Sequence, residues 1–223
     1  MNTEVKTTNV LQDLVSSLTG FPLWEGIQRL KNFFKRIQHI LAPSGIYEVL
    51  DYESTLELKD PKGEQASFRK REKVRYLQDN IIAYQDQAWG DGEVLLNYRA
   101  TPGKAVDFYR PGQKTYIVIS IRNVRNFGDQ DEFLIEWNMK NCFLRAQELW
   151  ETSIDHPTRR VKVNIIFPSS RPPLRVFIIE DSRKKGALLT DDNITLMLDG
   201  RWNVHWETDQ VRQNERYMLL WDW

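Results

Sequence analysis

From Ile46 onward the sequence alternates apolar and polar residues in short runs, and turn residues separate these runs. Successive side chains of a strand point to opposite faces of a sheet, so such runs are typical of strands with one buried face. The later runs cover residues 80–89, 93–100, 115–124, 132–139, 160–167, 174–181, 194–198, 201–206 and 216–223. Many short strands without intervening helices predict a mainly β chain folded as an antiparallel β-sandwich.

The first two runs flank the turn Asp60-Pro61-Lys62-Gly63, in which proline suits the second position and glycine the left-handed one. A hairpin closed by residues 60 and 64 would place Leu50 opposite Val74, Leu56 opposite Phe68 and Leu58 opposite Ala66. This register brings the apolar sides of both strands together, as a buried face demands.

Residues 9–41 carry helical rather than strand spacing. The apolar positions are Leu11, Leu14, Val15 and Leu18 in a first stripe, and Ile27, Leu30, Phe34, Ile37 and Leu41 in a second. Gly20 and Pro22 end the first stripe, and Pro43 ends the second. We expect two short amphipathic helices in an N-terminal segment, residues 1–43, and a β-sandwich domain over residues 44–223. A helical pattern also occurs at residues 142–150.

The second expected helix is basic opposite its apolar stripe. Such helices dock on protein partners or on anionic membranes, or they simply cover a core. If this helix docks, its partner is another protein, a second copy of the chain or a peripheral membrane face. The candidate partner-binding residues are Arg29, Leu30, Phe33, Phe34, Lys35 and Ile37.

Four basic residues, Arg69, Arg71, Lys73 and Arg75, occupy alternate positions of one expected strand and share one face. They could bind an anion. The hairpin register, however, sets Asp51 opposite Lys73 and Glu53 opposite Arg71, and opposite charges across strands are an ordinary way to solvate an outer face. The ladder is the preferred interpretation.

The last 23 residues, 201–223, contain four of the eight tryptophans. Trp202 and Trp206 share one strand face, and Trp221 and Trp223 alternate with Asp222 near the end of the chain. Aromatic pairs stabilise antiparallel sheets, so a core role is expected, with Trp221 buried and the terminal Trp223 freer. The alternative is a ligand surface formed by Trp202, Trp206 and Trp221.

The composition argues against several classes of protein. Lys plus Arg and Asp plus Glu both number 31, so no net charge attracts nucleic acid. The single cysteine, Cys142, and three histidines show no metal-ligand spacing, and we expect no metal, no cofactor and no nucleotide site. Asp129, Asp131 and Glu132 lack the spacing of a calcium loop. The polar start without a signal-peptide pattern suggests a cytoplasmic protein.

These observations favour a non-enzymatic intracellular interaction module that docks a partner or subunit through its N-terminal helix or sandwich surface. The alternative is a small-molecule or lipid-binding β-domain with an aromatic-lined pocket. A third possibility is a hydrolase whose carboxylates meet only in the folded chain. A large enclosed apolar pocket would favour the second hypothesis, and buried carboxylates that face each other in a cleft would favour the third.

Overall fold

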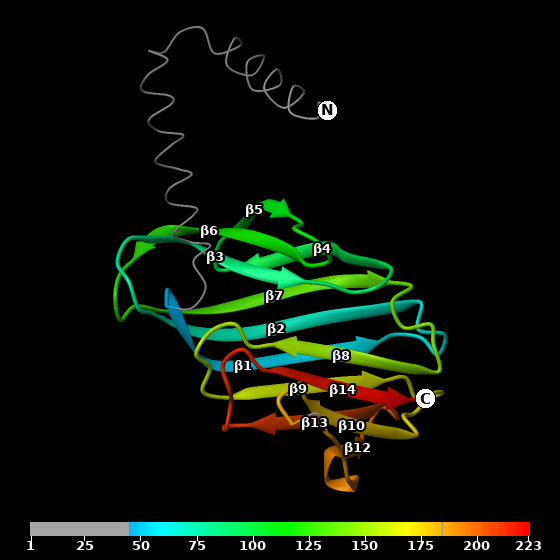
Figure 1. Cartoon of the computed structure of the whole chain (residues 1–223). Coiled ribbons are helices and arrows are strands. Elements are labelled where there is room, and N and C mark those ends of the chain that lie inside the picture. The colour runs from blue at the N-terminus through cyan, green and yellow to red at the C-terminus, as the bar shows by residue number, and fades with distance from the viewer. Residues whose placement is uncertain (1–44, 184) are drawn as a thin grey trace, which may run out of the picture. The chain divides into compact units, whose positions relative to one another are not determined.

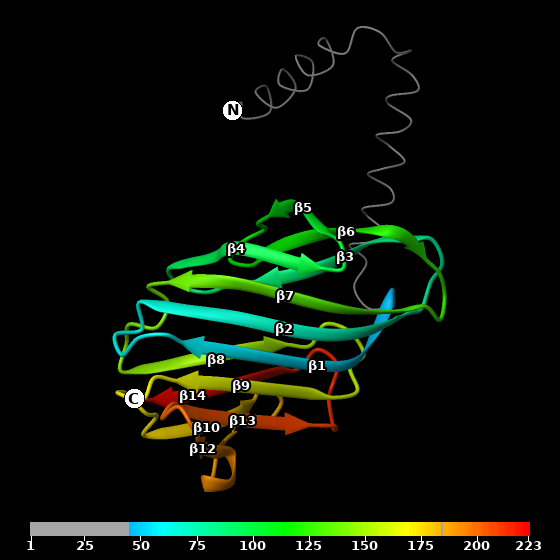
Figure 2. The same cartoon turned by 180° about the vertical axis from the view of Figure 1, so that it is seen from behind.

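A computed structural model describes residues 45–183 and 185–223, which form fourteen strands in three sheets. The largest sheet consists of β1 (Tyr47–Leu58), β2 (Gln65–Tyr76), β4 (Glu93–Thr101), β7 (Gln130–Lys140), β9 (Val161–Phe167), β12 (Ile194–Leu196) and β13 (Trp202–Thr208). Its strand order is β12-β13-β9-β1-β2-β7-β4, which can be followed across the front of Figure 2.

Two smaller sheets form the other layer (Figure 1). One contains β3 (Ile81–Ala88), β5 (Lys104–Tyr109) and β6 (Thr115–Arg125), and the other contains β8 (Gln147–Ser153), β10 (Arg175–Glu180), β11 (Lys185–Leu188) and β14 (Arg216–Asp222). A short 3-10 helix, Asp191–Asn193, precedes β12. The expected mainly β, sandwich-like architecture is therefore confirmed.

The second layer is divided between two strand edges. In the orders β3-β6-β5 and β11-β10-β14-β8, both β3 and β8 are edge strands. Figure 1 shows these two edges facing each other in front of β2 and β7. The second layer is thus interrupted over β2 and β7 of the large sheet.

The β1–β2 hairpin has the predicted register over most of its length. Leu56 pairs with Phe68 and Leu58 with Ala66, and all four side chains are buried. Near the start of β1 the register shifts between Val49 and Asp51, so that Val49, rather than Leu50, lies opposite Val74. The irregularity inserts one unpaired residue, which changes the face that each preceding side chain occupies. The expected pairing of Leu50 was wrong for this reason.

Two further expectations are corrected. The sheets are not antiparallel throughout, because β1 pairs with β9 in parallel, from Tyr52 opposite Val161 onward. The helix expected at residues 142–150 is also wrong: residues 142–146 form a connecting segment, and from Gln147 the chain continues as β8, in which Trp150 lies opposite Leu219 of β14. The apolar spacing of this segment fits the helical period as well as the strand period, and the segment forms a strand because it pairs with β14.

The core lies between the layers, and the C-terminal strand belongs to it. Trp221 is fully buried, as predicted, and its ring packs edge-on against Phe167. Trp223 is only 9% exposed, so it is nearly as buried as Trp221 despite its terminal position. Its indole nitrogen donates to the carbonyl of Arg145 at 2.8 Å, and the guanidinium of Arg171 stacks 3.7 Å from its ring centre.

The predicted helices at residues 9–41, the boundary at Pro43 and all six candidate partner-binding residues fall outside the described residues. Within the described part, no helix has the length and apolar character needed to cross a bilayer.

Candidate functional site

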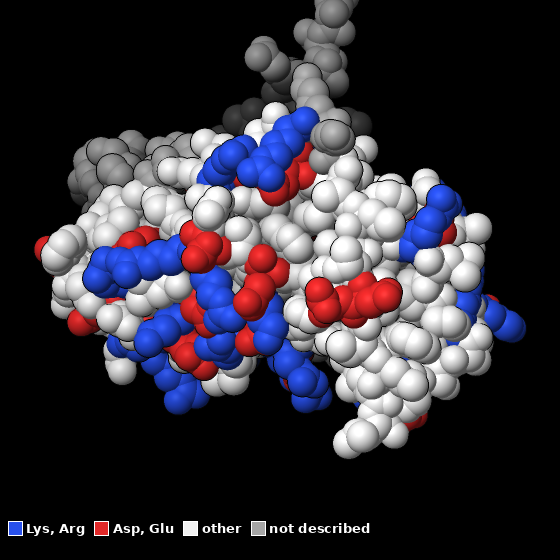
Figure 3. Space-filling view, turned by 90° about the horizontal axis from the view of Figure 1, so that it is seen from below, with Lys and Arg blue, Asp and Glu red and all other residues white. Residues whose placement is uncertain are grey.

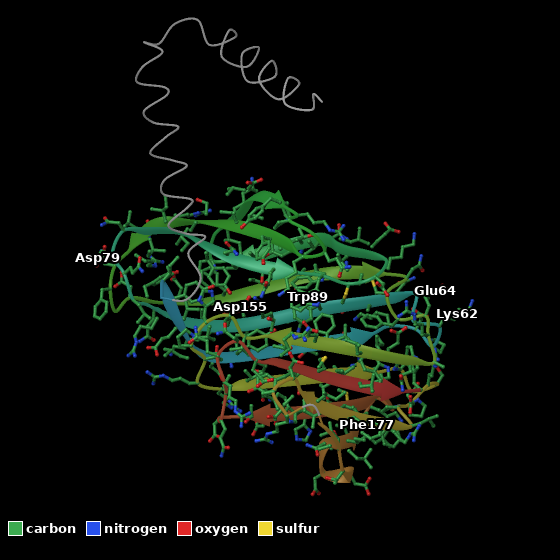
Figure 4. All side chains as sticks on the ribbon, in the orientation of Figure 1. Lys62, Glu64, Asp79, Trp89, Asp155 and Phe177 are labelled. Carbon is green, nitrogen blue, oxygen red and sulfur yellow. The ribbon has the colours of Figure 1, made fainter. Side chains whose placement is uncertain are left out.

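A pocket of about 680 Å³ opens between the edges of β3 and β8, and we call it the β3–β8 pocket. Side chains of β2 and β7 form its floor, and residues of β3, β8 and the segments after each of them form its walls. Trp89 and Asp155, labelled in Figure 4, both line it and lie between β3 and β8 in that view. The volume is within the range of small-molecule sites, roughly 300–1,000 Å³.

Three charged side chains meet in this pocket, and we call them the buried ion triad: Lys70, Glu72 and Asp86. The ammonium of Lys70 donates to Asp86 Oδ1 at 2.6 Å and lies 2.9 Å from Glu72 Oε2. Their side chains are 9%, 7% and 0% exposed for Lys70, Glu72 and Asp86. Tyr98 donates its hydroxyl to the other oxygen of Asp86 at 2.8 Å. One cation therefore faces two carboxylates in a largely dehydrated place.

Strand alternation explains why two of these charges point inward. On β2 the even-numbered residues from Ala66 to Tyr76 are buried and the odd-numbered ones are more exposed. Phe68 and Val74 occupy the same inner face as Lys70 and Glu72. Asp86 reaches the triad from β3, where Tyr84 and Ala88 are buried with it.

The triad holds its lysine charged. Burial alone would lower the pKa of Lys70, but the charges of Asp86 and Glu72 outweigh this effect and raise that pKa well above its usual value. A lysine that acts as a nucleophile or base needs a lowered pKa. Lys70 is therefore suited to balancing the charges of Glu72 and Asp86 rather than to covalent chemistry.

Tyrosine rings surround the ammonium group. Lys70 Nζ lies 5.9 Å from the ring centre of Tyr52 and 5.8 Å from that of Tyr84. Burial raises the pKa of Tyr52 to about 12, and burial likewise raises the pKa of Tyr47, Tyr84 and Tyr98. The phenols stay protonated at neutral pH, and their rings offer faces to a cation.

An aromatic wall continues toward β8. Phe68 on the floor lies between two tryptophans, with ring centres 4.3 Å from Trp137 and 4.8 Å from Trp150. Several lining residues also carry a buried polar atom without a hydrogen-bond partner among the described residues: Gln87 Oε1, Trp137 Nε1, Trp150 Nε1, Thr152 Oγ1 and His156 Nδ1. Buried polar groups are normally paired, so such a concentration around one pocket is unusual.

His156 lies in the wall of the pocket next to Tyr47. Its ring centre is 4.1 Å from that of Tyr47, at an interplanar angle of 32°. Burial lowers the pKa of His156, so the imidazole is neutral at physiological pH. Nearby, Gln87 donates to Asp155 at 2.6 Å and so ties β3 to the segment that carries His156.

At the other end the pocket reaches Cys142, whose thiol contacts the carbonyls of Lys140 and Glu93 at 3.4 and 3.7 Å. Burial raises the pKa of the Cys142 thiol, which leaves little of the nucleophilic thiolate. Arg145 and Asp91 form an exposed ion pair of 3.1 Å among the lining residues. These residues supply the rim of the pocket.

The three tryptophans named as an alternative ligand surface lie outside this pocket. None of Trp202, Trp206 and Trp221 lines the β3–β8 pocket. Trp206 packs against Tyr217 with ring centres 4.9 Å apart, and Trp221 lies in the core. The aromatic residues that line the pocket come instead from β1, β2, β3, β7 and β8 and their adjoining segments.

The four basic residues of β2 lie on the outer face of the large sheet, and two of them, Arg71 and Arg75, pair with carboxylates. Arg71 contacts Asp51 at 2.5 Å and Glu53 at 3.2 Å, and Arg75 pairs with Glu48. These pairs agree with the charge ladder of the predicted register, in which Glu53 faces Arg71. Basic and acidic side chains also lie beside one another on the face seen in Figure 3.

Among the described residues, no group of three His, Cys, Asp or Glu side chains is placed to hold a metal ion. The acidic turn around Gly128 has internal partners. Asp131 receives both hydrogen bonds of Arg125, at 2.7 and 2.8 Å, and Asp129 accepts from the backbone of Asn126 at 2.9 Å. Its carboxylates thus stabilise the turn between β6 and β7.

We expect His156 to make the domain sensitive to mild acid. Its folded pKa is lowered, so the unfolded chain takes up this proton more readily as the pH falls below about 6.5, and stability falls with it. The slope is at most about 1.4 kcal/mol per pH unit for one proton. The range from pH 7.5 to 5 spans the ordinary histidine pKa of roughly 6.5. Over this range we expect the denaturant midpoint of unfolding to decline less in His156→Phe than in the wild-type chain. The control variant His205→Gln should show the wild-type decline. Equal declines in both variants would contradict this role.

No family model and no curated protein matches the sequence. The fold is similar to solved structures at low identity. One is an M1 zinc metallopeptidase from Deinococcus radiodurans, with 11% identity and a TM-score of 0.47 over 78% of this chain and 42% of that chain. Another is a two-domain M1 zinc metallopeptidase mutant bound to L-arginine, with 12% identity and a TM-score of 0.44 over the same shares. This chain thus spans less than half of theirs, and a likeness this weak identifies neither a family nor an activity.

Proposed function

We propose that this chain is a small-molecule-binding β-domain and that its ligand occupies the β3–β8 pocket. The observation that carries the proposal is a pocket of about 680 Å³ that combines aromatic walls with a buried ion triad at its base. Ligand sites in proteins are concave, mostly apolar and supplied with a few placed polar groups. The unpartnered polar atoms of Trp150 and Thr152 in the wall add to this support.

Binding is preferred over catalysis because the ionisable groups are committed to one another. Glu72 and Asp86 both contact the ammonium of Lys70. In a pair of catalytic carboxylates the substrate bond lies between the two groups, and here the ammonium occupies that place. The raised pKa of Lys70 and of the Cys142 thiol makes both poor nucleophiles at neutral pH. His156 offers a neutral imidazole, but its Nδ1 has no orienting partner among the described residues.

The test fills the pocket. Val94 lines it and is partly buried against the core, so Val94→Trp should occupy its space. A small-molecule library is screened against the wild-type chain by ligand-observed NMR, and the affinity of each compound that binds is then measured for Val94→Trp. We expect these affinities to fall about tenfold or more. The matched control is Val124→Trp, which adds the same ring at a site of β6 that is 52% exposed. Binding that survives in Val94→Trp would contradict the proposal.

Docking of a protein partner, a second subunit or an anionic membrane by residues 1–43 stays a prediction from the sequence, as does the helical form of that segment. It is compatible with a ligand-binding domain, because the segment and the pocket involve different residues. A non-enzymatic, ligand-responsive module in the cytoplasm would combine both roles.

A further inference from the structure

The residues that line the β3–β8 pocket carry an excess of negative charge, although the whole chain has none. The acidic residues are Glu72, Asp86, Asp91, Glu148, Glu151 and Asp155, and the basic residues are Lys70 and Arg145. Glu151 is discounted because it pairs with Arg216 at 3.5 Å. Burial raises the pKa of Glu148, which is also discounted. Four acidic residues still remain against two basic ones.

The excess is deepest at the buried ion triad. Lys70 balances only one of its two carboxylate neighbours, and the side chains of Glu72 and Asp86 are 7% and 0% exposed. An unbalanced negative charge in so dry a place is costly, and a second cation nearby would reduce that cost. An anionic ligand would increase it.

The walls are made of groups that accept a cation. Aromatic ring faces attract ammonium and guanidinium groups within about 6 Å. Lys70 already lies at such distances from Tyr52 and Tyr84, which shows that these rings can surround a positive charge. The rings of Phe68, Trp137 and Trp150 continue the same kind of surface past the lysine.

We propose that the β3–β8 pocket selects an organic cation, a small molecule whose ammonium or guanidinium group lies beside the tyrosine rings of the pocket with Glu72 as its counter-ion. This inference rests on the proposed function and adds the chemical class of the ligand. The apolar remainder of the ligand fills the space between Trp137 and Trp150 on one side and β3 on the other.

Three probes of nearly one shape test the charge preference. Choline is the cation. Dimethylbutanol, as its 3,3-dimethylbutan-1-ol isomer, is the neutral analogue in which carbon replaces the choline nitrogen, and dimethylbutanoate, as the 3,3 isomer, is a related anion. Binding is followed by the chemical shifts of the indole N–H signals. For the wild-type chain we expect choline to bind about tenfold more tightly than dimethylbutanol, and dimethylbutanoate to bind most weakly. Dimethylbutanol binding as tightly as choline would overturn the inference, and so would the absence of choline binding.

The variant Glu72→Gln tests whether the buried ion triad causes the preference for a cation. The amide keeps the shape and leaves Lys70 balanced by Asp86 alone, so the variant should fold. We expect it to bind choline about tenfold more weakly and dimethylbutanol within about twofold of wild type. Glu136→Gln, on the outer face of β7 with a side chain 50% exposed, should change neither affinity. An unchanged choline affinity in Glu72→Gln would contradict the role of Glu72.

The outcomes separate this inference from the proposed function. If the three probes bind equally and Val94→Trp removes all of them, the pocket binds small molecules without selecting charge. If binding of every probe is indifferent to Val94→Trp, both proposals fail. The comparison of the three probes uses only the wild-type chain, so it holds even if Glu72→Gln does not fold.

Discussion

Lys70→Met is expected to destabilise the domain by about 3–5 kcal/mol, because it leaves Glu72 and Asp86 buried without their cation. Denaturant unfolding at neutral pH measures the loss. The same logic predicts that a triple variant, Lys70→Met with Glu72→Gln and Asp86→Asn, recovers most of it, since no buried charge remains.

The matched control for this loss is Lys73→Met, which removes the same charge from the outer face of the same strand. A surface change of this kind is expected to stay within about 0.5 kcal/mol. If Lys70→Met had the same denaturant midpoint as the wild-type chain, the prediction would be wrong. The Lys70 ammonium would then have to be exposed to water, where losing it costs little stability. The pH dependence offers a second check. The raised pKa of Lys70 means that its contribution is complete below about pH 10.5 and is lost as the pH rises through the folded pKa.

Trp221→Ala should cost about 3–5 kcal/mol, the usual loss when a large buried ring is removed. The side chain is fully buried and packs against Phe143, Phe167 and Trp223. Unfolding in denaturant with an unchanged slope would show that the change lies in stability.

Two comparisons locate this effect. Trp223→Ala should cost about 2 kcal/mol, because the terminal residue is also buried but its surroundings can relax more easily. Met218→Ala changes a partly exposed neighbour on the other face of β14 and should cost less than Trp221→Ala. An unchanged midpoint for Trp221→Ala would show that the ring is dispensable to the core.

Much of the fold follows from the alternation of residues along the chain. The turn at Asp60 and the matched faces of the first hairpin predict its register from Asp51 to Leu58, since a slip by one residue would expose the apolar side. The shift near Leu50 has no comparable local signal. The parallel partner of β1 depends on a contact between distant segments, which local periodicity does not encode.

The site was harder to predict than the fold, although part of its signal is present in the sequence. The alternation that sends Arg69 and Arg71 outward also sends Lys70 and Glu72 inward, between Phe68 and Val74. Two opposite charges at inward positions of one strand indicate a buried ion pair. Asp86 could not be added in the same way, because it comes from another sheet. The pocket itself arises from two strand edges whose positions only the assembled layers determine.

The parallel pairing of β1 with β9 has a consequence for how the chain folds. β1 can close its hairpin with β2 early, but its other edge waits for β9, and every strand from β2 to β8 lies between them in the sequence. Contacts of such high sequence separation slow folding, since much of the chain must be ordered before they form. During synthesis the central strand of the sheet therefore carries an open edge, and this edge is where self-association of the unfinished chain would begin.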